Sequence, residues 1–241
     1  NSHTHFNAFF RELPDFLNLM PEYRPKWVID EIRNKADVLY PGCCFPAQEN
    51  WARPTPTADL PPMIIWNHRW EFDKNPKDFF DALDAVLDRG LEFRVALLGE
   101  NFQVVPKEFI AAKERYRNRV IWYGYEPSRE RYREWLIQGT IVVSTAKQEN
   151  FGISVIEAIH YGCIPLLPDR LSYPEIIPRA FHDDFLYQDQ KELVEKLCFF
   201  ISNYQQFQIE SQKLSAAMSR FAWENLIDRY DEILEKLATK G

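Results

Sequence analysis

Runs of apolar residues alternate along the chain with longer amphipathic runs. Five short runs are apolar almost throughout: MIIW (63–66), FRVALLG (93–99), VIWYG (120–124), TIVVST (140–145) and CIPLLP (163–168). Strands that are apolar on both faces and separated by helices are typical of a parallel sheet covered by helices on both sides. The pattern therefore predicts an α/β fold, a Rossmann-like parallel sheet, over residues 60–215.

Residues 75–90 carry the complete signature of one of these helices. Asn75 is a candidate N-cap, Pro76 suits the first turn and Gly90 suits the end. Further helices are predicted by the amphipathic runs at 106–116, 128–139 and 152–162. The apolar stripe of the first helix consists of Phe79, Phe80, Leu83 and Leu87.

Residues 1–59 precede this domain. The run 6–20 predicts a helix, ADVLYPG (36–42) a strand, and the proline-broken run 51–62 a linker. The first ten residues, NSHTHFNAFF, contain neither an initiator Met nor the basic and apolar segments of a signal peptide. We expect residues 1–59 to be the tail of another domain plus a linker, in a chain cut from a longer protein.

Residues 216–241 form the third predicted part. The run FAWENLIDRYDEILEKLA (221–238) predicts a long amphipathic helix, which we expect to pack back toward the N-terminal part. One face of this helix consists of Leu226, Tyr230, Ile233 and Leu237.

Composition narrows the class of protein. The chain has 241 residues, 46% of them hydrophobic and 27% charged, which is ordinary for a globular domain. No apolar run approaches the roughly 20 residues that span a bilayer, so no membrane association is expected. The four cysteines form no C-x-x-C pair, and reduced thiols in the cytoplasm are expected. The net charge of −7 gives no overall attraction to nucleic acid.

Ligand sites in open α/β sheets lie beyond the carboxyl ends of the strands. The loop after the first predicted strand contains Arg69 and Lys74, just before a helix N-terminus. Two cations beside free backbone N–H groups suit a phosphate or diphosphate. Taken alone, a solvated loop in which these cations pair with Glu71 and Asp73 is the simpler interpretation.

The next two loops contain weaker signals. Gly99, at the end of the second predicted strand, permits a close approach of backbone to a ligand but also suits a plain turn. After the third predicted strand come Gly124 and Tyr125. Tyr125 could flank a nucleobase, and a core tyrosine at a strand end is at least as simple an interpretation.

The fourth loop, with the helix after it, contains ENFGISVIE (149–157). Glu149 precedes a Phe-Gly turn, and Glu157 follows two helical turns later with seven residues between the two acids. A solvated helix glutamate would explain Glu157. However, the spacing aims its carboxylate back toward the loop, where it could accept hydrogen bonds from a diol. Each loop alone is weak evidence, but together the four predict a ligand site.

Other patterns are better explained without a ligand. His3 and His5 form an H-x-H pair with no accompanying ligand cluster. The runs KERYRNR (113–119) and SRERYREW (128–135) interleave Arg and Tyr as RNA-binding surfaces do, but their glutamates favour a salt-bridged helix face. The sequence contains no G-x-G-x-x-G, P-loop or G-x-S-x-G motif, which disfavours an oxidoreductase, a P-loop nucleotidase and a serine hydrolase. It also lacks an Asp-x-Asp metal clamp.

The Arg-x4-Lys loop, the glycine turns and Glu-x7-Glu together resemble the donor half of retaining GT-B glycosyltransferases of family 4. The runs HRWEFDKNP, LLGENF, YGYEPS, STAKQENFGISVIEA and GCIPLLPDRLSYPEI are more closely similar to the tRNA-queuosine α-mannosyltransferases. The resemblance covers residues 62–178 strongly and the first fifty residues loosely. It implies that the predicted domain is the C-terminal, donor-binding half of a GT-B fold, preceded by a short remnant of the N-terminal domain.

The resemblance also implies roles for the loop residues. Arg69 and Lys74 would hold the donor diphosphate, Glu157 the ribose, and Glu149 the transferred hexose. Glu149, Arg69 and Lys74 would be the catalytic set. The backbone of Asn150, Phe151 and Gly152 would grip the hexose with Glu149, while Gly99, Gly124 and Tyr125 would complete the donor pocket, the last two near the base.

The implied reaction is retaining transfer of mannose from GDP-mannose to queuosine in tRNA. Fixed cations and a helix N-terminus would meet the charge that grows on the leaving diphosphate, so no metal or other cofactor is expected. Because a GT-B enzyme carries its acceptor site on the N-terminal domain, this chain alone is expected to bind donor but to be inactive, and tRNA binding is expected to need that domain. No oligomeric state is implied.

Two alternatives remain open. A family 4 glycosyltransferase with another nucleotide-sugar donor and a glycan or lipid acceptor would prefer a uridine or adenine nucleotide. A non-catalytic nucleotide-binding or interaction module would not depend on Glu149. An oxidoreductase is a more distant third because the glycine fingerprint is missing.

Overall fold

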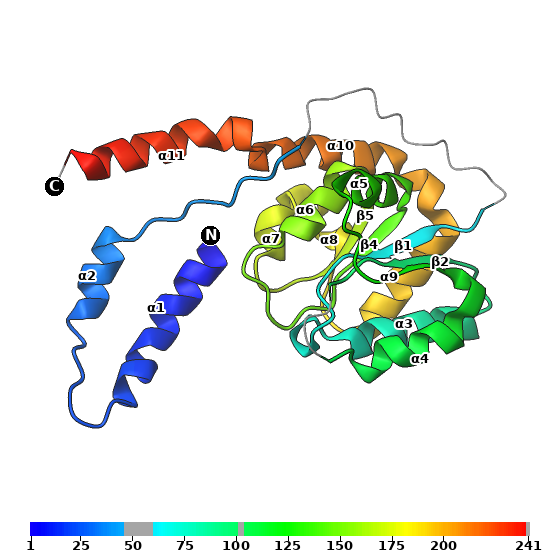
Figure 1. Ribbon diagram of the computed structural model, residues 1–241, viewed down its shortest axis with the longest axis horizontal. Helices are drawn as coiled ribbons and strands as arrows, with labels where there is room; N and C mark the ends of the chain where they lie inside the picture. The colour runs from blue at the N-terminus through cyan, green and yellow to red at the C-terminus, as the bar shows by residue number, and fades with distance from the viewer. Residues whose placement is uncertain (46–59, 101–103, 240–241) are drawn as a thin grey trace.

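A computed structural model describes residues 1–45, 60–100 and 104–239. Its centre is a six-stranded sheet in the order β3-β2-β1-β4-β5-β6, in which every neighbouring pair is parallel (Figure 1). This confirms the predicted α/β parallel sheet. The strands are β1 (Met63–Trp66), β2 (Arg94–Leu97), β3 (Val120–Tyr123), β4 (Ile141–Val143), β5 (Ile164–Pro168) and β6 (Leu186–Tyr187).

Helices cover both faces of the sheet. The helix α3 packs against α4 and α9, whereas α6 packs against α5 and α10, and these two groups lie on opposite sides (Figure 1). Two short helices, α7 and α8, lie between β5 and β6 along the chain. The bounds are α3 (Pro76–Asp88), α4 (Lys107–Tyr116), α5 (Arg129–Gln138), α6 (Ile153–His160), α7 (Tyr173–Ile176), α8 (His182–Phe185), α9 (Gln190–Asn203) and α10 (Gln208–Met218).

The continuous apolar runs form strands because both of their faces are covered. All four residues of β1 are fully buried, as such a strand requires. In α3 the predicted stripe is buried except Leu87, which is half-buried, while Val86 is fully buried instead. The prediction for Asn75 needs a correction: it occupies the N-cap position, but its side chain donates to Asp78 Oδ2 instead of accepting from a backbone N–H.

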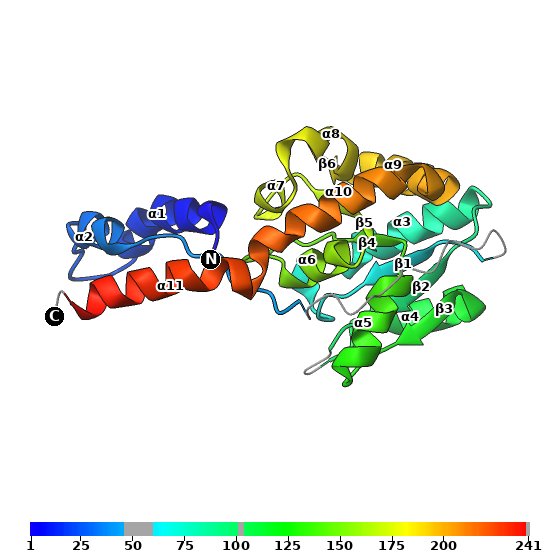
Figure 2. The ribbon, with the colours of Figure 1, turned by 90° about the horizontal axis from the view of Figure 1, so that it is seen from above.

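The N-terminal part lies beside the sheet domain (Figure 2). It contains the predicted helix, α1 (His3–Asn18), and an unpredicted one, α2 (Val28–Lys35). The strand predicted at 36–42 is wrong. This stretch is extended, but no strand among the described residues lies beside it, and the nearest ladder contact is the isolated bridge between Cys43 and Ala222. The predicted linker lies largely outside the described residues.

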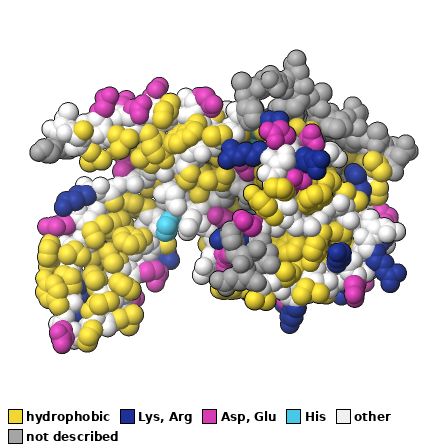
Figure 3. All heavy atoms as spheres, viewed as in Figure 1, with side chains coloured by type: hydrophobic (Ala, Val, Ile, Leu, Met, Phe, Trp, Pro, Cys, Tyr) yellow, Lys and Arg dark blue, Asp and Glu magenta, His cyan; other side chains and the backbone are white. Residues whose placement is uncertain are grey.

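The last helix, α11 (Trp223–Ala238), runs along the extended N-terminal segment. Tyr230 Oη donates to the carbonyl of Tyr40 at 2.9 Å, and Arg229 donates to the carbonyl of Val38 at 3.2 Å. Of the predicted face, Leu237 is 64% exposed and the other three residues are half-buried. Figure 3 shows apolar side chains gathered on α1, α2 and α11. In the described part of the chain, no helix has the length and apolar character to cross a membrane.

Candidate functional site

A pocket of about 310 Å³ lies where the loops after β1 and β4 meet. It contains most of the residues predicted from these two loops, which lie about eighty positions apart in the sequence. Its lining consists of Asn1, Pro41, Asn67, His68, Arg69, Lys74, Glu149, Asn150, Phe151, Gly152, Ile153 and Ser154.

Lys74 is the buried cation of the pocket. Its side chain is 8% exposed, and Nζ donates to the carbonyl of Gln148 at 2.7 Å. The same nitrogen lies 3.2 Å from Asp73 Oδ2 and 3.3 Å from Glu149 Oε2. The pairing with Asp73 exists, but Lys74 is not solvated as the simpler interpretation required. Lys74 therefore belongs to a buried cluster of paired charges, in which the loss of one partner would be costly.

Arg69 stands at the rim of the pocket. Its side chain is 52% exposed and lies 3.3 Å from Glu71 Oε2. An exposed ion pair of this kind contributes little to stability. The guanidinium is therefore available to an incoming anion at small cost.

The turn that carries Glu149 is fixed from several directions. Glu149 Oε1 accepts from the backbone N–H of Phe151 at 3.3 Å, and Ser172 Oγ donates to the carbonyl of Phe151 at 2.6 Å. Gly152 has φ of 102° and precedes the first turn of α6. A side chain there would be strained and would meet Ile176 Cδ1 at 3.0 Å. The backbone at the start of α6 thereby stays open to the pocket.

The side chain of Phe151 anchors this turn. It is 3% exposed, stacks on Tyr40 at 5.4 Å and meets Phe221 edge-on at 5.4 Å. The aromatic cluster ties the turn to the N-terminal segment and to the region before α11. Ser2 adds a hydrogen bond from Oγ to the carbonyl of Asn150 at 3.1 Å.

Glu157 does not line this pocket. Its Oε2 accepts from Tyr132 Oη at 3.2 Å, and Tyr132 Oη in turn accepts from Asn67 Nδ2 at 3.1 Å. Burial raises the pKa of the Glu157 carboxyl, while the hydrogen bond from Tyr132 and the charge of Arg129 act in the opposite direction. Glu157 is therefore linked to the pocket through Asn67.

The remaining predicted residues lie away from the lining. A Cβ on Gly99 would meet Trp70 Cδ1 at 1.9 Å and the carbonyl of His68 at 2.4 Å, so Gly99 lets Trp70 pack over the end of β2. Gly124 has φ of 123°, and Tyr125 is 58% exposed. Residues 101–103, from the loop after β2, lie outside the described part of the chain. The donor-binding roles of Gly99, Gly124 and Tyr125 stay predictions.

Asn67, His68 and Tyr132 are among the residues of the site that sequence reasoning missed. Asn67 and His68 directly follow β1, so their position at a strand end was an available signal. His68 is 3% exposed, and burial lowers the pKa of its imidazole to about 4, with Glu149 opposing and Lys74 reinforcing that shift. The ring is therefore neutral at pH 7. Tyr132 comes from α5, and no local pattern connects it to the loops.

The start of α1 contacts the sheet domain next to the pocket. The Glu175 carboxylate accepts from the backbone N–H groups of His3 at 2.9 Å and Thr4 at 2.6 Å, and from Tyr40 Oη at 3.1 Å. His5 Nδ1 lies 2.8 Å from Asn1 Oδ1. Across the described ranges, no group of three or more His, Cys, Asp or Glu side chains is placed to hold a metal ion, and independence of a metal stays a prediction.

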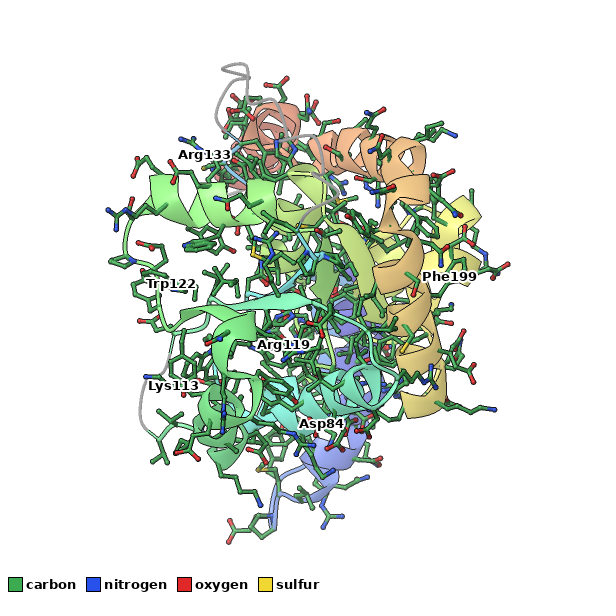
Figure 4. All side chains as sticks on the ribbon, turned by 90° about the vertical axis from the view of Figure 1, so that its right-hand side faces the viewer. Asp84, Lys113, Arg119, Trp122, Arg133 and Phe199 are labelled. Atoms are coloured by element: carbon green, nitrogen blue, oxygen red, sulfur yellow. The ribbon has the colours of Figure 1, made fainter. Side chains whose placement is uncertain are left out.

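The Arg-rich run 113–119 forms ion pairs with neighbouring elements instead of with its own glutamate. Arg119 pairs with Glu92 at 2.7 Å, and Arg115 pairs with Asp84 at 2.5 Å. Figure 4 shows Arg133 on α5 well apart from Lys113 on α4. All four cysteines are free in the structure.

Comparison with known proteins assigns this chain to a family. Residues 47–220 match the family model described as glycosyl transferases group 1. The chain belongs to this family. Residues 1–43 match a second model, described as the N-terminal part of tRNA-queuosine alpha-mannosyltransferase. Both matches confirm the resemblance noted from the loop motifs.

Curated relatives of this glycosyltransferase are longer than the chain itself. A Drosophila melanogaster protein described as tRNA-queuosine alpha-mannosyltransferase is 33% identical over 98% of this chain and 63% of its own length. A GDP-mannose:cellobiosyl-diphosphopolyprenol alpha-mannosyltransferase from Xanthomonas oryzae pv. oryzae is 25% identical over 69% of this chain and 45% of its own length. The chain thus spans between about half and two-thirds of the length of these relatives.

Solved structures share the fold of this glycosyltransferase. A lipopolysaccharide outer core galactosyltransferase superimposes with a TM-score of 0.64 at 21% identity, over 86% of this chain and 59% of that chain. The catalytic domain of a Helicobacter pylori cholesterol-alpha-glucosyltransferase gives a TM-score of 0.54 at 17% identity, over 68% of this chain and all of that chain. These neighbours are GT-B glycosyltransferases, which confirms the predicted fold class.

Proposed function

We propose that this chain is the donor-binding portion of a retaining glycosyltransferase that transfers mannose from GDP-mannose to queuosine in tRNA. The observation that carries the proposal is the meeting of Lys74 and Glu149 in one pocket, beside the first turn of α6. The name of the fly relative supports the mannosyl group and the tRNA acceptor. The second relative, whose name includes GDP-mannose, supports the donor.

In the proposed mechanism the diphosphate lies between Lys74 and Arg69. Breaking the bond between hexose and diphosphate builds negative charge on the leaving phosphate oxygens and positive charge on the anomeric carbon. Lys74 is already held by backbone and side-chain partners, so it meets the growing charge without reorganising. The N–H groups at the start of α6 add the positive end of a helix dipole. With this stabilisation the reaction needs no metal.

Glu149 holds the hexose in this scheme. Its Oε1 is occupied by the Phe151 N–H and its Oε2 faces Lys74, so the carboxylate stands where sugar and diphosphate join. Sugar hydroxyls donate readily to a carboxylate. Glu157 takes the ribose hydroxyls from the side of Asn67 and Tyr132.

The first test is the thermal stabilisation of the protein by GDP, UDP, ADP and GDP-mannose. A ligand at 100 times its Kd adds about 2.7 kcal/mol to the unfolding free energy. We expect selective stabilisation by GDP and GDP-mannose that is lost in Arg69→Ala and Glu157→Ala but kept in the exposed controls Arg131→Ala and Glu130→Ala. Stabilisation by UDP or ADP alone would refute the donor assignment.

A second candidate acceptor is a lipid-linked glycan. It is favoured by the named acceptor of the Xanthomonas relative, a cellobiosyl-diphosphopolyprenol. Nucleotide binding does not separate the two acceptors. Incorporation of labelled mannose into queuosine-containing tRNA, against tRNA lacking queuosine and against a polyprenol-linked disaccharide, separates them directly.

A further inference from the structure

Asn67 has a fixed amide with one unused acceptor. It directly follows β1, lines the pocket and is 7% exposed. Its Nδ2 donates to the carbonyl of Ser154 at 2.6 Å and to Tyr132 Oη at 3.1 Å. Two acceptors facing one nitrogen fix the orientation of the amide, because the reversed amide would set oxygen against oxygen at Ser154. The Oδ1 atom is consequently held on the side of the amide that faces away from the Ser154 carbonyl.

Asn67 Oδ1 is buried and has no hydrogen-bond partner in the described chain. Buried polar atoms in native proteins are nearly always satisfied, and an exception calls for an explanation. A carbonyl oxygen only accepts, so its missing partner must bring an O–H or N–H group. Since Asn67 lines the pocket, a ligand bound there is the natural source of that group.

Tyr132 extends the same network to a second acceptor. Its hydroxyl receives the Asn67 hydrogen bond and donates its single proton to Glu157 Oε2. The network therefore presents acceptors at both ends: the free Oδ1 of Asn67 and the Glu157 carboxylate. These acceptors differ from the region around Lys74, where cations would bind the diphosphate of the donor. Two acceptors joined by one hydrogen-bond network suit a ligand with several hydroxyl groups.

We propose that Asn67 is a further donor-binding residue, whose Oδ1 accepts a hydrogen bond from a sugar hydroxyl of the nucleotide sugar, and that Tyr132 positions Asn67 and Glu157 for this contact. The proposal rests on the proposed function, because it takes a nucleotide sugar as the ligand. Ribose and hexose present the same hydroxyl chemistry, and the experiment separates them. Tyr132 is a positioning residue in this scheme and need not touch the donor.

The test compares affinity ratios in Asn67→Ala, Tyr132→Phe and the wild-type protein. Titration calorimetry gives the Kd of GDP, 2′-deoxy-GDP, 3′-deoxy-GDP and GDP-mannose, and the corresponding uridine and adenosine nucleotides are run beside them. Asn118→Ala and Tyr204→Phe serve as matched controls outside the network. A variant that only loosens the fold lowers all affinities together and leaves the ratios unchanged.

We expect the wild-type protein to lose about tenfold in affinity when the recognised hydroxyl is absent. In Asn67→Ala that difference should shrink to less than about threefold, with a smaller shrinkage in Tyr132→Phe. Collapse of a GDP to deoxy-GDP ratio assigns the contact to ribose, and collapse of the GDP-mannose to GDP ratio assigns it to the hexose. Unchanged ratios in Asn67→Ala would overturn this inference alone. Absence of binding to every nucleoside diphosphate by the wild-type protein would overturn the proposed function itself.

Discussion

The ammonium group of Lys74 lies 3.3 Å from the carboxylate of Glu149, and their side chains are only 8% and 16% exposed. The two residues come from the loops after β1 and β4, so the parallel order of these neighbouring strands creates the contact. One member suits a diphosphate and the other suits a sugar. In the proposed mechanism, their contact marks the position of the bond between sugar and diphosphate that is broken.

Lys74→Met should weaken the binding of GDP by about ten- to a hundredfold, since a hydrogen bond to a charged group contributes about 1.5–3 kcal/mol. It should also lower Tm, because Asp73 and Glu149 would lose their shared counter-charge. Calorimetric titration checks the affinity. Lys147→Met, an exposed lysine of the same turn, is the matched control and should leave the Kd unchanged. An unaltered Kd in Lys74→Met would contradict the diphosphate assignment.

Glu149→Gln should weaken the binding of the hexose without weakening the binding of the nucleotide. The amide keeps an oxygen for the Phe151 N–H but removes a negative charge beside Lys74. GDP should therefore bind as well as before or more tightly, while the advantage of GDP-mannose over GDP should fall by about tenfold. Competition binding with the two ligands measures both effects. Equal losses for GDP and GDP-mannose would argue against a contact with the hexose.

His68 should make stability depend on pH. Its pKa of about 4 in the folded chain lies below the ordinary value of about 6.5, mainly because the ring is buried. Between pH 6.5 and pH 4, His68 is protonated in the unfolded chain but stays neutral in the folded chain. This contribution to stability is therefore complete above pH 6.5 and falls by about 1.4 kcal/mol per pH unit as the pH drops toward 4.

Urea unfolding of His68→Phe across this pH range isolates that contribution. The variant should start from a lower stability, because burial of the imidazole includes a hydrogen bond to the Val143 backbone. Its stability should then change less steeply between pH 6.5 and pH 4 than that of the wild-type protein. His5→Phe, at an exposed position, should keep the wild-type slope. Identical slopes in all three proteins would mean that His68 titrates normally.

Glu175→Ala should loosen the N-terminal part. The carboxylate holds the first turn of α1 and the Tyr40 hydroxyl, and its loss leaves these donors without that partner. Hydrogen exchange at residues 1–20 should become faster, with a decrease in Tm of a few degrees. Glu195→Ala on the exposed side of α9 is the control. Unchanged exchange near α1 would show that the aromatic cluster holds this part without Glu175.

Much of the sheet domain follows from local sequence. The strands β1 to β5 are continuous apolar runs, and α3 is bounded by Asn75 and Gly90, so local pattern and tertiary burial agree. Residues 36–42 show where local sequence fails to predict the structure. Its composition suits a strand, but strands need neighbours, and within the described residues the nearest pairing is a single bridge at Cys43.

The positions that line the pocket were predictable where residues follow the carboxyl ends of strands, and unpredictable where hydrogen bonds join side chains of other elements. Arg69, Lys74 and Glu149 stand at strand ends, which the parallel sheet brings together. The hydrogen bonds that join Asn67, Tyr132 and Glu157 connect the loop after β1 with α5 and α6. No spacing within one segment encodes that network. The burial of Lys74 likewise depends on the packing of two distant loops.

The most direct test of the account is a crystal structure of this chain with GDP-mannose bound. We predict that the diphosphate lies within hydrogen-bonding distance of Lys74 Nζ and Arg69, with the mannose against Glu149 and the backbone at the start of α6. A nucleotide sugar bound elsewhere, or one whose diphosphate lies away from Lys74, would contradict the assignment of this pocket as the donor site.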